Sequence, residues 1–383
     1  MKKNYQAIVI GGGYFGCSSA YNLAKASIST LLLEKNEITS GASGANFGCV
    51  QVQDASPGLS LELTLAGFAK MKTMEKELNR DIGFNLQGSL IAAEYEHHLP
   101  ELQQLYQTMR GSGLNIQWLE GERLYQMEPN LKNGSIRAAT YFEQGRIYPF
   151  HYMYAQIARG KEYGLDVAEN TAVAELLMEN GKCTGVILVD GNAIRAEQIV
   201  ITAGAWTREL CKKAGLDVPV YSVKAEAFVT EAIEPFLRNY YSSAGFFAEA
   251  HSQESAAMSL CIGQSHYGNL LIGETSKPEN MVSADLADNT SMEHCRRVKQ
   301  KVAEFFPALE NIKILRSWVT ASPYTDTCLP VFGKSAIPGL IVAAGFKSCA
   351  VISPMVGEII ADLVARDSCK YDLSEFIGQS KLL

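Results

Sequence analysis

The chain of 383 residues is long enough for two domains and too long for a single compact core. Apolar residues make up 47% of it and charged residues 20%, which is ordinary for a globular protein. The formal net charge of −7 is spread along the sequence, without the basic stripe that nucleic-acid binding requires. We therefore expect no nucleic-acid partner.

The nine cysteines are scattered and contain no Cys-x-x-Cys pair. Their spacing indicates neither a disulfide framework nor a metal site, and we predict reduced thiols in a cytoplasmic protein. The apolar run near the N-terminus is too short for a signal peptide and ends in glycines instead of a cleavage site. No stretch of about 18 apolar residues is present, so no transmembrane segment is expected.

The first predicted strand is residues 7–10, four apolar residues followed at once by a glycine-rich turn. Apolar residues then recur at helical spacing in residues 17–24, which predicts a helix that begins at the glycines. A second buried strand is predicted at residues 30–33. The order strand, glycine turn, helix, strand is typical of a unit that binds a dinucleotide.

Three glycines and one acid carry this dinucleotide motif. Gly11 permits the tight turn, Gly13 lets the backbone approach a pyrophosphate, and Gly16 lets the helix pack closely on the strand. The helix N-terminus offers free N–H groups to that pyrophosphate. Glu34 is predicted to accept hydrogen bonds from a ribose, and its charge argues against NADP. An ordinary glycine-rich turn is the less favoured alternative, since the whole context of the motif is present.

A second run of small residues, Ser40-Gly-Ala-Ser-Gly-Ala-Asn-Phe-Gly48, follows the second strand. Its N–H groups and hydroxyls suit a ligand that the backbone must approach closely, although a Gly/Ser surface loop has the same composition. Together with the glycine motif and Glu34, this run resembles the FAD-dependent D-amino-acid oxidase, glycine oxidase and sarcosine oxidase family. Many members of that family have an arginine where this chain has Ala45.

The resemblance implies FAD as the cofactor and an α/β fold, with a Rossmann-like FAD-binding domain and an inserted antiparallel-sheet α+β domain for the substrate. It places the discontinuous FAD-binding domain at residues 1–85, 145–219 and 317–383, and the substrate or cap domain at residues 86–144 and 220–316. Beyond the three glycines and Glu34, the N-terminal residues that it implicates in FAD binding are Tyr14, Phe15, Lys35, Ser40, Gly41, Ala42, Ser43, Asn46, Phe47 and Gly48.

Helical spacing predicts helices at residues 59–78, 99–110 and 150–163. His97 and His98, just before the second of these, are expected to be solvated. Hairpin turns at Asn180-Gly181 and Asp190-Gly191 predict a meander of strands at 172–178, 183–189 and 193–196, followed by a buried strand at 199–202. In this region the resemblance implicates Val173, Ala203, Gly204 and Trp206 in FAD binding, although Val173 also suits a plain strand core.

The inserted domain is predicted to continue with strands at residues 225–229, 257–262 and 269–272. The sequence Thr290-Ser-Met-Glu293 has the pattern of a capping box, and it predicts a helix that ends before Pro307. Counting back from Gly273, Cys261 occupies the position where glycine oxidases carry a tyrosine that binds the substrate carboxylate. The resemblance therefore implies that this chain binds the substrate carboxylate in a different way.

Residues 316–333 and 340–354 match the C-terminal pattern of the family, with an altered turn at 325–328 and a final helix predicted at 354–364. The loop before that helix is implicated in FAD binding through Gly345, Lys347, Ser348, Cys349, Ala350 and Val351. Lys347 is the first candidate for holding a substrate carboxylate or tuning the flavin, with a solvent-facing lysine as the alternative. Arg316 and Tyr324 are the other candidates for a catalytic role, although Arg316 also suits an ion pair at a strand end.

The expected function is that of an FAD-dependent oxidoreductase. It would oxidise the C–N bond of a small amino acid or amine by hydride transfer, giving an imine that hydrolyses. One alternative is the catalytic subunit of a hetero-oligomeric dehydrogenase that passes electrons to a partner subunit, and homo-oligomers are also compatible with the sequence. A second alternative is a flavin-binding protein without catalysis. An NAD-linked dehydrogenase is less favoured, because it leaves the second glycine run and the C-terminal loop without a role.

Overall fold

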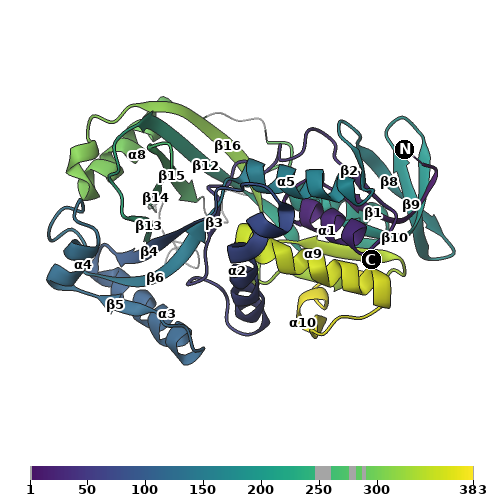
Figure 1. Ribbon diagram of the computed structural model, residues 1–383, viewed down its shortest axis with the longest axis horizontal. Helices are drawn as coiled ribbons and strands as arrows, with labels where there is room; N and C mark the ends of the chain where they lie inside the picture. The colour runs from purple at the N-terminus through teal and green to yellow at the C-terminus, as the bar shows by residue number, and fades with distance from the viewer. Residues whose placement is uncertain (1, 246–259, 276–281, 287–289, 383) are drawn as a thin grey trace. The chain divides into compact units, whose positions relative to one another are not determined.

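A computed structural model describes residues 2–245, 260–275, 282–286 and 290–382 (Figure 1). The chain divides into two compact units. The first unit comprises Met1–Phe84, Arg146–Ser222 and Ser322–Leu383, and the second comprises Asn85–Gly145 and Val223–Ala321. The roles predicted for them, FAD binding in one and substrate binding in the other, stay predictions.

The first unit is built on a mainly parallel sheet with the strand order β17-β18-β10-β1-β2-β7. β1 pairs in parallel with β2 and β10, while β10 also pairs in parallel with β18. The meander strands β8 and β9 join this sheet through the antiparallel pairing of β9 with β10. The strands are β1 (Asn4–Ile10), β2 (Thr30–Leu33), β7 (Asp166–Ala168), β8 (Val173–Glu179), β9 (Lys182–Leu188), β10 (Ala193–Ile201), β17 (Val331–Lys334) and β18 (Leu340–Ala344).

One strand replaces the two that were predicted at residues 193–196 and 199–202. β10 is continuous because β1 pairs with one of its edges from Arg195 to Ile201. On the other edge the partner changes from β9 at Ala193–Arg195 to β18 at Ile199–Ile201. The close approach of β9 is possible because Gly185 has no side chain to collide with the Ile194 carbonyl. The gap between the two predicted strands is therefore only the point where the neighbour changes.

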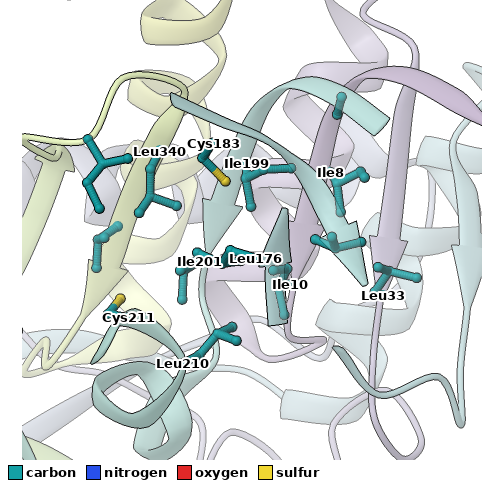
Figure 2. Close-up of a cluster of buried hydrophobic side chains, with 14 of the residues drawn as sticks. Ile8, Ile10, Leu33, Leu176, Cys183, Ile199, Ile201, Leu210, Cys211 and Leu340 are labelled. Atoms are coloured by element: carbon teal, nitrogen blue, oxygen red, sulfur yellow. The ribbon is translucent and has the colours of Figure 1, made fainter. Parts of the chain in front are cut away.

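The core of the first unit lies on both faces of this sheet. Alternate residues of β1, such as Ile8 and Ile10, join Ile199, Ile201 and Leu340 in one buried cluster (Figure 2). The intervening residues, Ala7 and Val9, are equally buried. A parallel sheet needs such cover on both faces, and it explains the uninterrupted apolar run of the first strand.

Helices α1 (Tyr14–Lys25) and α9 (Cys349–Arg366) pack closely together in this unit. A side chain at Gly357 would collide with Ser18. The two helix backbones therefore approach each other closely at this glycine. The remaining elements of the first unit are β3 (Cys49–Val50), α2 (Leu59–Leu78), α5 (Pro149–Glu162), α6 (Thr207–Lys213), β11 (Leu216–Asp217), α10 (Ser374–Ile377) and β19 (Lys381–Leu382).

The start of α9 corrects the prediction that the last helix begins at Pro354. The helix begins at Cys349 and continues through the proline. Pro354 has no N–H to bond the carbonyl of Ala350, and the hydroxyl of Ser353 donates to that oxygen instead, at 2.9 Å. The substitute bond allows the proline to lie inside the helix.

The second unit has its own sheet, with the strand order β16-β12-β15-β14-β13-β4-β6 and β5 paired to β6. The pairs β12–β15, β14–β15, β13–β14 and β5–β6 are antiparallel, as expected, but β13 pairs with β4 in parallel. Its elements are β4 (Asn85–Ala93), α3 (Leu99–Gly111), β5 (Gln117–Leu119), α4 (Gly121–Met127), β6 (Ala138–Arg146), β12 (Val220–Ala232), β13 (Asn239–Ser243), β14 (Cys261–Gln264), β15 (Asn269–Thr275), α8 (Met292–Phe305) and β16 (Ile314–Thr325).

Helix α8 packs its apolar face, with Val298, Val302 and Phe305, on the core of this sheet. The residue that caps it is Ser291, whose hydroxyl accepts from the His294 N–H at 3.0 Å, and not Thr290 as the capping-box pattern suggested. The strand predicted at 257–262 begins in the structure at Cys261, and residues 257–259 lie outside the described residues.

His98 is a further correction, because it is buried and not solvated. Its side chain is 2% exposed, and its ring lies edge-on to that of His97 with 4.3 Å between the ring centres. The backbone of Gly245 leaves no room for a side chain beside the His98 ring. Burial lowers the pKa of His98 to about 4, assisted by the charges of His97 and Lys301.

All nine cysteines lie within the described residues and are free thiols. In the same residues no group of three or more histidine, cysteine, aspartate and glutamate side chains is arranged to hold a metal ion. None of the described helices combines the length and apolar character that a membrane span requires.

Candidate functional site

The glycine turn at the end of β1 is held so tightly that side chains do not fit there. Gly11 has a φ of +107°, and a Cβ at this position would lie 2.5 Å from the carbonyl oxygen of Thr202. A Cβ at Gly16 would collide with the carbonyl oxygen of Gly11. The sequence motif is therefore a steric requirement: only glycine lets the turn, the strand end and the first turn of α1 lie in contact.

Glu34, at the end of β2, lies directly beside this turn. One oxygen of its carboxylate, Oε2, accepts from the Gly12 N–H at 2.6 Å, and the other accepts from the Asn36 N–H at 2.9 Å. The ammonium of Lys35 lies 3.6 Å from the ring centre of Trp206, in the turn that follows β10. Glu34, Lys35 and Trp206, predicted from two separate stretches, thus surround the same end of the sheet.

The second run of small residues folds as a series of turns over the N-terminus of α1. Ser43 Oγ accepts from the Tyr14 N–H at 3.1 Å, and a Cβ at Gly13 would lie 2.6 Å from that oxygen. A Cβ at Gly41 would find its nearest neighbour, in Trp206, only at 3.9 Å. The run therefore combines one close approach to the helix end with open space beside it.

This cradle fits the adenosine and pyrophosphate of FAD. The first turn of α1 contains no acidic residue, so the positive end of the helix dipole is not neutralised by its own side chains. The Gly11 N–H donates to the Leu33 carbonyl and the Gly12 N–H to Glu34, so these two bonds hold the turn in place. The missing side chain of Gly13 then lets a phosphate approach the backbone at the N-terminus of α1. Glu34 carries the oxygens that a ribose diol requires.

Two predicted residues of this region have an evident packing role. Gly48 has a φ of +76°, and any side chain there would collide with the carbonyl oxygen of Ile147. Asn46 Oδ1 accepts from the Gly48 N–H at 2.7 Å and so stabilises the turn. Ser40 is exposed, while Ala42 and Phe47 are partly buried.

The C-terminal loop reaches the glycine turn. The rings of Phe346 and Phe15 pack with 4.4 Å between their centres, and the Phe332 ring packs on Phe346 from β17. Gly345 has a φ of +74°, and a Cβ there would lie 2.6 Å from Cγ2 of Thr325. The altered turn at 325–328 is thus closed on this loop, with the Thr325 hydroxyl donating to the Leu329 carbonyl at 2.6 Å.

Lys347 and Ser348 follow, and they lie beside an acid that sequence reasoning missed. Ser348 Oγ donates to Oδ1 of Asp54 at 3.4 Å, and the charge of Lys347 acts on the same carboxylate. Asp54 comes shortly after the two-residue strand β3 (Cys49–Val50). No periodicity or motif marks Asp54 in the sequence. Its position shortly after the glycine-rich run is the signal by which it could have been found.

The other predicted residues of the loop belong to the first turn of α9. Ala350 and Val351 are buried, and the Val351 carbonyl packs on Gly67 of α2. Burial raises the pKa of the Cys349 thiol to about 12, so this cysteine is an uncharged packing group. Gly204 has a φ of +52° in the turn before α6, while Val173 and Ala203 are partly buried against the core of the first unit.

The two other candidates for catalysis lie on β16. Arg316 is exposed and belongs to the second unit, whereas Tyr324 is partly buried and belongs to the first. Cys261, at the position of the family tyrosine, lies on β14 directly opposite Gly273 of β15. The catalytic roles of Arg316, Tyr324 and Lys347 stay predictions.

Comparison with known proteins agrees with this geometry. The FAD dependent oxidoreductase family (DAO) matches residues 6–363. The chain is 29% identical to the glycine oxidase of Geobacillus kaustophilus (strain HTA426) over 391 aligned positions, which cover 98% of this chain and 97% of that one. It is 25% identical to the sarcosine oxidase subunit beta of an Arthrobacter species, with 96% of this chain and 88% of that protein covered.

Among solved structures, the crystal structure of glycine oxidase from Geobacillus kaustophilus superimposes with a TM-score of 0.86. That alignment covers 98% of each chain at 27% sequence identity. The chain that contains the glycine turn, Glu34 and the C-terminal loop thus follows one known architecture over nearly its whole length. The protein belongs to the DAO family of FAD-dependent oxidoreductases, and FAD is its cofactor.

Proposed function

We propose that this protein oxidises the C–N bond of a small amino acid or amine, giving an imine that water hydrolyses. The observation that carries the proposal is the packing of Phe346 on Phe15, which brings the Lys347 loop to the glycine turn. A cationic side chain next to a flavin site suits a substrate that carries a carboxylate. The named activities of the relatives, glycine oxidase and sarcosine oxidase subunit beta, support the same class of reaction.

Bound FAD supplies the hydride acceptor, and the chain supplies binding and orientation. In our proposal Glu34 holds the ribose, while the glycine turn and Ser43 hold the pyrophosphate at the N-terminus of α1. The positive end of α9 stabilises negative charge that collects nearby. Lys347 holds the substrate carboxylate and so fixes which C–H bond is presented for transfer.

Anaerobic mixing of the FAD-loaded protein with a panel of small amino acids and amines tests this proposal. We expect at least one amino acid to bleach the yellow absorbance of the flavin, and the product mixture to contain the keto acid or aldehyde together with ammonia or an amine. A protein that binds FAD, yet is bleached by no member of the panel, would contradict the proposal.

A second proposal concerns subunit composition. The similarity to a protein named as the beta subunit of a sarcosine oxidase favours a catalytic subunit that works within a hetero-oligomer. Turnover by the isolated FAD-loaded chain tests this: a subunit that needs a partner is reduced by substrate but turns over slowly with oxygen or an added dye, whereas a self-sufficient enzyme turns over with one of them at full rate.

A further inference from the structure

The structure brings Asp54 to the Lys347 loop without any prediction from the sequence. It contacts Ser348 through the 3.4 Å hydrogen bond from the Ser348 hydroxyl. Ser348 immediately precedes α9 with a φ of 50°, a left-handed conformation, and its side chain makes no capping bond to the helix. The hydroxyl is thus committed to Asp54 instead of to the helix that it precedes.

The Asp54 carboxylate has less positive charge around it than its burial demands. The groups that favour its ionised form are the Lys347 ammonium, the backbone N–H of Asp54, the Ser348 hydroxyl and the side chain of Gln51. Burial nevertheless raises the pKa of Asp54 above its ordinary value, because the lost hydration outweighs all of these interactions.

Glu77, in the same unit, shows what a structural ion pair does. It accepts from Lys25 at 2.6 Å and from the Tyr21 hydroxyl at 2.9 Å, and these partners hold its pKa below the ordinary value. Asp54 behaves in the opposite way. A partly buried carboxylate, which keeps some access to solvent and which its neighbours neutralise incompletely, is suited to a cation that arrives from solution.

We propose that Asp54 binds the ammonium group of the substrate while Lys347 binds its carboxylate, so that the pair selects α-amino acids over acids without an amine. This inference rests on the proposed oxidation of a C–N bond. An α-amino acid carries its two charges on neighbouring groups. This matches an acid from the segment after β3 and a base from the loop before α9, which the Ser348–Asp54 hydrogen bond brings together. A site built around a hydrogen bond from the substrate ammonium to Asp54 rejects an acid that lacks the amine, because the Asp54 carboxylate then loses that partner.

Two probes that differ only at the amine test the inference. Neither 2-aminoisobutyrate nor 2-hydroxyisobutyrate has a hydrogen on its α-carbon, so neither is oxidised, and their binding can be followed in the absorbance of the FAD-loaded protein. We expect the wild type to prefer the amino probe. In Asp54→Asn the affinity for that probe should fall about tenfold or more, while the affinity for the hydroxy probe stays within about twofold.

Asp362→Asn is the matched control, because it removes the same charge from the exposed side of α9. It should leave both affinities unchanged. Equal affinity of the wild type for the two probes, or a preference that Asp54→Asn leaves unaltered, would overturn the inference.

Thermal stability supplies a readout that does not depend on ligands. Because the pKa of Asp54 is raised by folding, its ionised carboxylate costs stability above that pKa, and the cost disappears as the pH falls toward about 4. Asp54→Asn should therefore melt at a higher temperature than the wild type at pH 8, and the two Tm values should converge on acidification. A lower Tm for the variant at pH 8 would show a structural carboxylate and overturn the inference.

The two proposals fail in distinguishable ways. If no amine or amino acid bleaches the wild-type flavin, yet Asp54→Asn still loses the amino probe, the reaction is wrong and the ammonium site stands. If amino acids bleach the flavin and Asp54→Asn keeps the wild-type preference, the ammonium site is wrong and the reaction stands.

Discussion

The glycine turn and the Asp54 cluster, which we define as Asp54, Lys347 and Ser348, belong to the same unit but are built by different physics. In the glycine turn, backbone atoms lie so close that any side chain collides, as at Gly11 and Gly16. In the Asp54 cluster the contacts join polar side chains, with 3.4 Å between Ser348 Oγ and Asp54 Oδ1. Steric fit determines the structure of the glycine turn, and electrostatic interactions determine that of the Asp54 cluster. The cofactor end of the site should therefore fail abruptly when altered, whereas the cluster should change specificity by degrees.

The largest effect is expected for Gly16→Ala. The added methyl group would collide with the Gly11 carbonyl oxygen and press on the Thr202 hydroxyl, and neither can move without disturbing β1 and β10. We expect a loss of about 3 kcal/mol or more in the free energy of unfolding, together with loss of bound FAD. Urea denaturation and the ratio of flavin to protein absorbance measure the two effects. Gly111→Ala, at a helical glycine with open space around it, should retain both.

Lys347→Met should affect function without affecting the fold. Losing the charged partner of the substrate carboxylate is expected to lower kcat/KM about a hundredfold for the best amino acid, and little for the corresponding amine without a carboxylate. Steady-state kinetics on the two substrates gives the comparison, with Lys212→Met on the exposed face of α6 as the control. An equal loss on both substrates would mean that Lys347 acts on the flavin and not on the carboxylate.

Glu34→Gln tests the acid that contacts the glycine turn. The amide oxygen can still accept from the Gly12 N–H, but it is a weaker acceptor for a ribose hydroxyl than the carboxylate is. The Kd for FAD should rise about tenfold, measured from the quenching of flavin fluorescence on titration with apoprotein. Glu37→Gln, at an exposed position three residues on, should bind FAD as the wild type does. Unchanged affinity in Glu34→Gln would remove the assigned ribose contact.

The smallest effect is expected for Ser348→Gly. Glycine suits the left-handed conformation better than serine does, and this gain offsets the loss of the hydroxyl that donates to Asp54. The free energy of unfolding should change by less than about 1 kcal/mol, and the affinity for 2-aminoisobutyrate by less than about threefold. A loss as large as that of Asp54→Asn would show that Ser348 itself binds the ligand.

Local signals in the sequence were sufficient for the backbone geometry around the glycine turn. β2 and α2 have the predicted bounds, Thr30–Leu33 and Leu59–Leu78, because each has an apolar period that its surroundings do not override. The glycine turn was predictable because the residues that collide lie close together in the sequence or in adjoining strands. Motif spacing records such sterics directly.

The features that were missed depend on contacts that no sequence period records. The burial of His98 depends on Gly245, far along the chain, while the early start of α9 depends on the neighbouring Ser353, whose hydroxyl replaces the bond that Pro354 cannot make. Asp54 is an ordinary acid until Ser348 and Lys347 lie beside it. Periodicity cannot report such contacts, because it describes only neighbours along one element.

The parallel pairing of β10 with β18 has a consequence for how the protein is made. β18 and α9 come from residues 340–366, and they complete the sheet edge and the cover of α1 in the unit that begins with β1. During synthesis β1 and α1 leave the ribosome long before these partners exist, and contacts of such sequence separation form slowly. We therefore expect capture of the flavin to be a late event, after residues 340–366 have been synthesised.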